Sequence, residues 1–132
     1  MTLAEFTITL HLRREEESGR TWTVFRVATV REFRMFRYRI QIDGGLDAGA
    51  RTFDFRIHGV QAPTNLMPET GAAFTELAFP DLDGEYRVRL AGAKSAEEFS
   101  FIVSARTIVL LPLPAGSTLN VGTEKEVENV RQ

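Results

Sequence analysis

Arginines at alternate positions are the residues of this chain best suited to binding chemistry. Arg37 and Arg39 are separated by one residue, which would place both on the same face of a strand. A guanidinium group presents fixed pairs of N–H donors that match the oxygens of a carboxylate or a phosphate. We therefore predict a shallow anion site on the outer face of a sheet. Its predicted ligand-binding residues are Arg26, Arg37, Arg39 and Arg56.

The pairing of the strands decides whether these arginines meet. In the register that the apolar pattern favours, Arg26 lies opposite Arg37, and Arg56 lies beside Arg37. If the third strand pairs instead with the sixth, Arg87 and Arg89 join the same face. The alternative is a solvated face, on which the arginines pair with neighbouring carboxylates and extend their stems over apolar side chains.

Three carboxylates at alternate positions, Asp81, Asp83 and Glu85, form an oxygen-rich turn of the kind that can hold calcium. The calcium loop of an EF-hand needs glycine at its sixth position and glutamate at its twelfth, where this chain has Tyr86 and Gly92. The segment is therefore interpreted as a solvated turn, and no metal site is predicted.

Sequence signatures of catalysis are missing from the chain. It has no cysteine, no Gly-x-Ser-x-Gly elbow, no phosphate-binding glycine loop and no His-Glu-x-x-His. We therefore predict no catalytic residues and no cofactor. A hydrolase that uses loop carboxylates is a remote alternative, because a glycosidase needs only a pair of carboxyl groups.

Alternating apolar and polar residues predict β-strands along most of the chain. The first covers residues 6–13, and a β-rich stretch over 20–42 is too long for one strand and must break near 30–33. Further strands are predicted at residues 53–58, 74–79, 85–91, 98–104 and 106–111, with a loop at 43–50. About eight strands predict an all-β, antiparallel sandwich, with an eight-stranded up-and-down barrel as the alternative. Phenylalanines at inward positions favour the filled interior of the sandwich.

The first two connections between predicted strands differ in their turn-forming residues. Ser18 and Gly19 predict the turn of the first hairpin, with Leu10 opposite Val27 on the buried face. The connection over residues 30–33 lacks the turn-forming Gly, Pro, Asn and Asp. The second and third strands therefore either pair as neighbours or belong to different sheets.

The turn from Pro80 to Gly84 feeds a strand that begins near Tyr86. This segment resembles the tyrosine corner of immunoglobulin-like and fibronectin-III-like sandwiches, in which a tyrosine near the start of the sixth strand bonds back to the chain before it. The resemblance implies an immunoglobulin-like sandwich with a buried Tyr86 whose hydroxyl group bonds near the turn. The segment is also similar to that of uncharacterised bacterial β-sandwich domains, and neither resemblance implies site residues.

Large apolar side chains on the outer face of the sheet, from the second strand to the start of the third, predict an interface. These residues are Trp22, Val24, Phe33 and Met35. A contiguous apolar patch usually marks a surface that binds a partner or is covered by a second layer. We predict self-association, with a two-fold homodimer as the expected form. The alternative is that a twist or bulge moves half of these side chains into the core.

Composition sets the remaining expectations. The chain has 132 residues, for which we predict one sandwich domain over 1–122 and a charged tail over 123–132 that is frayed or a short helix. The net charge of −2 predicts no attraction to nucleic acid, and no apolar run is long enough for membrane insertion. We expect a soluble, cytoplasmic, non-catalytic interaction module that self-associates, or alternatively one that binds a small anion on the arginine face.

Overall fold

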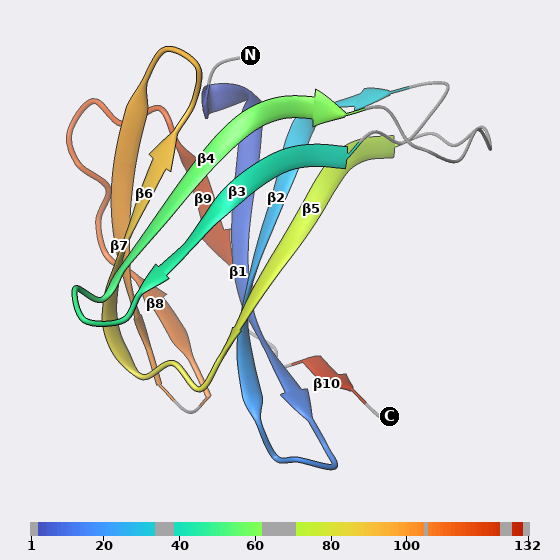
Figure 1. Ribbon diagram of the computed structural model, residues 1–132, viewed down its shortest axis with the longest axis vertical. Helices are drawn as coiled ribbons and strands as arrows, with labels where there is room; N and C mark the ends of the chain where they lie inside the picture. Colours follow the sequence, from blue (N-terminus) through green and yellow to red (C-terminus); the bar gives the residue numbers. More distant parts are fainter. Residues whose placement is uncertain (1–2, 34–38, 62–70, 105, 125–127, 131–132) are drawn as a thin grey trace.

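Two five-stranded sheets make up the protein, in a computed structural model that describes residues 3–33, 39–61, 71–104, 106–124 and 128–130. A short 3-10 helix, η1 (Leu3–Glu5), precedes the first strand (Figure 1). Sheet A has the order β10 (Glu128–Val130), β1 (Phe6–Glu15), β2 (Thr21–Phe33) and β5 (Gly71–Pro80), and β9 (Asn120–Thr123) also pairs with β1. Sheet B has the order β3 (Arg39–Asp47), β4 (Thr52–Gln61), β6 (Gly84–Ala91), β7 (Ala96–Val103) and β8 (Ile108–Leu110).

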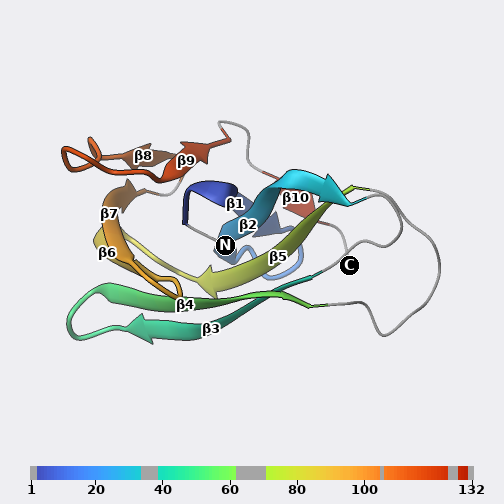
Figure 2. The same ribbon diagram turned by 90° about the horizontal axis from the view of Figure 1, so that it is seen from above.

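The arrangement of the sheets confirms the predicted all-β sandwich and not the alternative barrel. Sheet B curves, so that β3 and β4 lie on one side of β1 and β2 while β8 lies on the other (Figure 2). The prediction of antiparallel strands missed three parallel pairs, which join β4 to β6 and β1 to both β9 and β10. Parallel neighbours need a crossover connection, and β5 is part of one because the chain passes through sheet A between β4 and β6.

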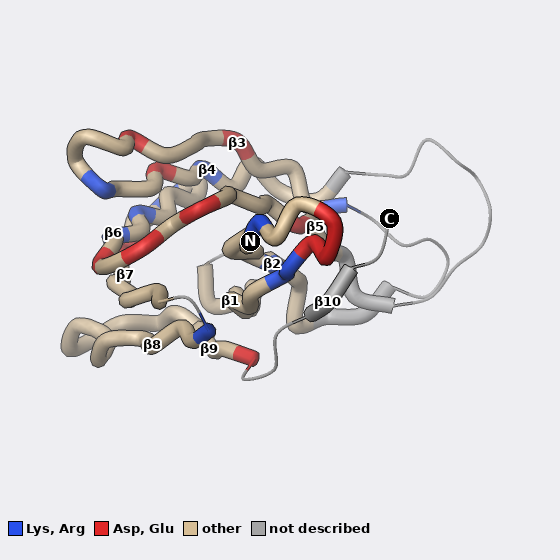
Figure 3. Tube along the Cα trace, turned by 90° about the horizontal axis from the view of Figure 1, so that it is seen from below, with Lys and Arg blue, Asp and Glu red and all other residues tan. Residues whose placement is uncertain are grey.

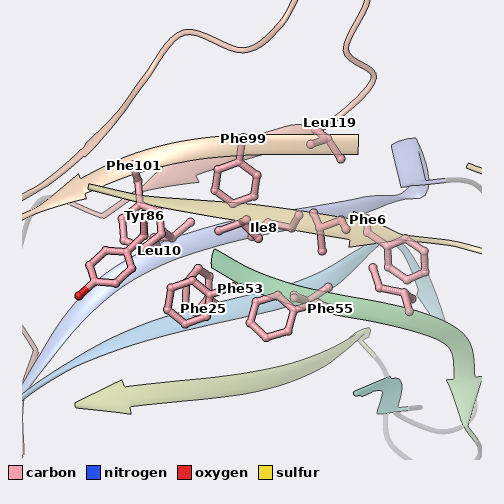
Figure 4. Close-up of a cluster of buried hydrophobic side chains, with 14 of the residues drawn as sticks. Phe6, Ile8, Leu10, Phe25, Phe53, Phe55, Tyr86, Phe99, Phe101 and Leu119 are labelled. Carbon is pink, nitrogen blue, oxygen red and sulfur yellow. The ribbon is translucent and has the colours of Figure 1, made fainter. Parts of the chain in front are cut away.

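The space between the sheets is filled by aromatic side chains, as the sequence predicts. Phe53 is completely buried, and its ring centroid lies 5.0 Å from that of Phe25 (Figure 4). The centroid of the Phe79 ring lies 4.8 Å from that of Phe53. Tyr86 and Phe101 stack beside it, with 5.8 Å between their centroids. These inward positions alternate with exposed polar ones on β4 and β6, which explains the period of two in the sequence.

The first hairpin has the predicted buried face but a different register. Leu10 pairs with Phe25 rather than with Val27, and His11 pairs with Val24 rather than with Arg26. The cause is the turn: the Gly19 N–H donates to the Glu15 carbonyl oxygen at 2.9 Å, so the loop has four residues, 16–19, instead of a tight centre at Ser18–Gly19. A shift of two residues keeps every side chain on the same face, which is why the predicted core survives the error.

The second and third strands belong to different sheets, which confirms one of the two predicted alternatives. β2 pairs with β1 and β5, whereas β3 pairs with β4. The predicted loop at 43–50 is wrong for most of its length, because β3 continues to Asp47. Gly44 makes this possible: its φ is 127°, and a Cβ there would overlap the backbone carbonyl oxygen of Asp54 on β4.

The C-terminal segment is also organised as strand. Residues 128–130 form β10, which pairs in parallel with β1 and places Glu128 beside Arg13 in the register. The predicted frayed tail or short helix is therefore wrong for these residues.

The segment before β9 is held by the Glu97 side chain, which accepts hydrogen bonds from the N–H and Oγ1 of Thr118. The Thr118 side-chain hydrogen bond lowers the pKa of Glu97 and anchors the segment that leads into β9.

The described part of the chain contains no helix with the length and apolar character needed to cross a membrane.

Candidate anion-binding site

The four predicted arginines do not form one row. Arg26 is on sheet A, where its guanidinium lies over the Phe74 ring, 4.5 Å from Cζ to the centroid. Arg39 and Arg56 are exposed on sheet B, on β3 and β4. Arg37 lies outside the described residues. The predicted cluster is therefore wrong for Arg26, because β2 and β3 belong to different sheets and do not pair.

Acidic and basic residues are interspersed along β3, β4, β6 and β7 (Figure 3), and most of them are exposed. Arg56 pairs with Asp43 in the β3–β4 register, and Arg89 forms an ion pair of 3.5 Å with Glu98. The Asp43 carboxylate also lies 2.7 Å from Nε2 of His58. Arg89 therefore fits the solvated alternative, whereas Arg56 forms no ion pair within the described residues.

One part of this face is hollowed, at the end of the sheet where β4 and β6 begin. The hollow has a volume of about 260 Å³ and a mainly polar lining. Thr52 of β4, Arg87 of β6 and Ser100 of β7 stand next to one another in the register of the three strands. The complete lining is Ala50, Arg51, Thr52, Glu85, Tyr86, Arg87 and Ser100. We call this hollow the Arg87 pocket.

Arg87 and Ser100 have side chains that are available to a ligand. Within the described part of the chain, neither the Arg87 guanidinium nor the Ser100 hydroxyl makes a hydrogen bond or an ion pair. Arg89, two residues along the same strand, is held by Glu98 instead. A free guanidinium next to a free hydroxyl can supply a paired N–H fork and an O–H donor to one anion.

Arg51 is fixed at the edge of the Arg87 pocket. Its backbone is in the left-handed region, with a φ of 51°. Its Nε donates to the Glu85 carbonyl oxygen at 3.0 Å, and its Nη2 donates to the Asp83 carbonyl oxygen. The guanidinium lies over the Tyr86 ring, 4.3 Å from Cζ to the centroid. Arg51 therefore holds the β5–β6 turn, while Arg87 is left to bind.

The turn that Arg51 holds contains the predicted buried tyrosine. Tyr86 is 7% exposed, and its hydroxyl oxygen accepts a hydrogen bond from the Asp83 N–H at 3.4 Å. This confirms that Tyr86 is buried and bonded to the preceding turn. Arg51 and Tyr86 together hold the turn at the edge of the Arg87 pocket.

Replacing Arg51 with lysine is expected to lower the free energy of unfolding by about 1–2 kcal/mol, because an ammonium group cannot donate to both carbonyl oxygens while covering the ring. Urea denaturation measures the effect. Arg56→Lys is the matched control, since Arg56 is exposed and unpaired within the described residues, and it should change stability by less than about 0.5 kcal/mol. Equal midpoints for the two variants would contradict the structural role of Arg51.

The predicted interface residues differ in their surroundings. Trp22 and Val24 both lie on the outer face of sheet A, but Val24 is completely buried within a single chain and Trp22 is half-buried. The side chain of Phe33 and the whole of Met35 lie outside the described residues. The expectation of an exposed patch is therefore wrong for Val24, and self-association stays a prediction that light scattering can test.

The loop carboxylates do not converge. Asp81 and Asp83 are exposed, and Asp81 forms an ion pair of 3.3 Å with Arg20. Among the residues that the structure describes, no group of three or more His, Asp or Glu side chains is placed to hold a metal ion.

Comparison with protein-family models, curated proteins and solved structures gives no match to this chain. The functional argument therefore depends on the geometry of the Arg87 pocket. Sequence reasoning placed Arg87 on a shared face only in its alternative pairing and did not select Arg51 or Ser100. The available signal was the tyrosine turn, which fixes where β6 begins and hence which side chains face the hollow.

Proposed function

We propose that this protein is a non-catalytic binding module that takes a small organic monocarboxylate in the Arg87 pocket. The observation that carries the proposal is the adjacency of Arg87 and Ser100, two donors that line one hollow and have no partner among the described residues. The planar carboxylate fits the guanidinium fork in a bidentate manner, and the remaining lone pairs can accept from the hydroxyl.

The charge of the lining favours a monoanion. Arg51 and Arg87 are cationic and Glu85 is anionic, so the lining carries a formal charge of +1. Arg51 already donates to two carbonyl oxygens, which leaves Arg87 as the main attraction. The Glu85 carboxylate of the same lining would repel a dianion such as phosphate more strongly than a monoanion. A monocarboxylate matches the formal charge of the lining with less repulsion.

The absence of catalysis is part of the proposal. Within the described residues, Ser100 has no hydrogen-bonded base that could activate its hydroxyl as a nucleophile. The pocket supplies donors for a stable anion and no pair of groups arranged for proton transfer.

We also propose that the sandwich is of the immunoglobulin-like kind. It is supported by the buried Tyr86 and by its hydrogen bond to the turn before β6. In such a domain the Arg87 pocket would be a sheet-face site beside the tyrosine corner.

Acetate is the simplest probe of the proposed function. Titrated to high millimolar concentration at constant ionic strength, it is expected to shift the backbone amide resonances of Arg87 and Ser100 in a saturable way. Arg87→Gln should abolish saturation, because it removes the charge and the guanidinium fork. Two-dimensional ¹⁵N–¹H NMR measures both the affinity and the location.

The matched control is Arg89→Gln. It removes the same charge from the same strand and face, but the guanidinium it removes is already paired with Glu98. The control should bind acetate like the unmodified protein. An equal loss of acetate binding in both variants would mean that acetate responds only to the general charge of the face. Resonance shifts that rise linearly without saturation in the unmodified protein would contradict the proposal.

A further inference from the structure

We infer that the carboxylate ligand carries an unbranched alkyl chain of medium length, which lies over an apolar strip beside the Arg87 pocket. This inference rests on the proposed function and specifies its ligand class. The strip consists of Ile102 on β7 and of Val109 and Leu111 on and just after β8.

The strip lies on the same outer face as Arg87 and Ser100. On β7, Phe101 and Val103 are buried, so Ser100 and Ile102 point outward. On β8, Ile108 and Leu110 pack against the core, which turns Val109 to the outer face. Leu111 continues this alternation.

The strip begins one step from the proposed carboxylate position. Ser100 faces Leu111, whose N–H donates to the Ser100 carbonyl oxygen at 3.0 Å. Ile102 pairs directly with Val109 in the next outward row. Diagonal neighbours on a sheet face are about 7–8 Å apart, so an alkyl chain that starts between Arg87 and Ser100 reaches Ile102 and Val109.

The strip has exposed apolar surface that a chain could cover. Ile102 is 39% exposed and Val109 is 54% exposed, which makes them two of the few large apolar side chains at the surface of the described residues. Charged side chains occupy much of the rest of this face. A cationic pocket that adjoins an apolar strip is complementary to an amphiphilic anion, with its head at Arg87 and its tail along β8.

The test compares acetate, butyrate, hexanoate and octanoate below their aggregation concentrations, with the same NMR titration. Affinity is expected to rise with chain length, and octanoate should bind at least about tenfold more tightly than butyrate, since each methylene group removed from water contributes favourably. The additional resonance shifts should fall on Ile102 and Val109.

The variant Val109→Ser with Ile102→Thr separates the tail from the head. Both replacements are at exposed positions on strands and keep the core intact. The double variant should bind acetate normally and lose the dependence on chain length. Arg87→Gln should weaken the binding of every member of the series.

Each outcome has one meaning. If octanoate binds no more tightly than acetate while acetate still needs Arg87, the apolar strip is not part of the site and the proposed function stands. If the chain-length effect persists in the double variant, the tail lies elsewhere and the inference is wrong. If no carboxylate depends on Arg87, the proposed function and the inference both fail.

Discussion

Replacing Phe53 with alanine is expected to lower the free energy of unfolding by about 3–5 kcal/mol. The Phe53 side chain is completely buried between the sheets. Its ring contacts aromatic rings from both sheets, including Phe25 and Phe79 on sheet A and Phe101 on sheet B. Removal of the ring leaves a cavity that neither sheet can close alone. Urea denaturation measures the loss, and an unchanged slope would show that the unfolded state is not affected.

Phe79→Ala is the matched comparison for Phe53→Ala. It removes the same ring from the same aromatic cluster, but Phe79 is only partly buried, on the edge strand β5. The free energy of unfolding should fall less in Phe79→Ala than in Phe53→Ala, because surrounding groups and water can fill part of the space. A larger loss for Phe79 than for Phe53 would mean that the cluster is centred elsewhere.

Gly44→Ala is expected to destabilise the protein by about 2–5 kcal/mol, since it combines backbone strain with a steric clash. The φ of Gly44 is 127°, which side chains rarely tolerate. The added methyl group would overlap the backbone carbonyl oxygen of Asp54, and backbone cannot rotate away as a side chain can. Thermal unfolding followed by circular dichroism measures the effect.

Gly45→Ala tests whether the effect of Gly44→Ala is specific. Gly45 is the next residue in the same strand, its φ is not positive, and an added Cβ would have no atom within 4 Å. A small change, below about 1 kcal/mol, is expected there, because the residue can adopt the required conformation. Similar large losses at both positions would show that β3 is disrupted in general rather than at its close approach to β4.

The alternation of apolar and polar residues was enough to predict which side chains fill the core. It did not predict which strands are neighbours, because that depends on the turns and crossover connections between them. Phe25, Phe53 and Phe101 are buried as expected. The observed register of the first hairpin differs by two residues from the predicted one, because its turn has four residues. A shift of two residues leaves every side chain on the same face, so the alternation of the sequence cannot detect it. The parallel pairs of β1 and β4 involve strands far apart in the chain, for which a local pattern carries no signal.

The candidate site was harder to predict than the core. The sequence indicated anion binding by arginines, but the availability of a guanidinium depends on its neighbours in space. Arg87 and Arg89 are both exposed at alternate positions of β6, yet the Glu98 carboxylate forms an ion pair only with Arg89. Ser100 reaches the pocket because β7 is the neighbour of β6. These facts follow from strand order, which composition and spacing left open.

The parallel pairing of β1 with β9 and β10 also sets the order in which the molecule can be completed. β1 precedes β9 and β10 by most of the sequence, yet Thr7 pairs with Asn120 and Glu15 pairs with Val130. A nascent chain that has emerged only as far as β7 has therefore no partner for this edge of β1. Unpaired N–H and C=O groups on such an edge are a template for other chains. This edge of β1 is therefore exposed from the time β1 forms until β9 and β10 align with it.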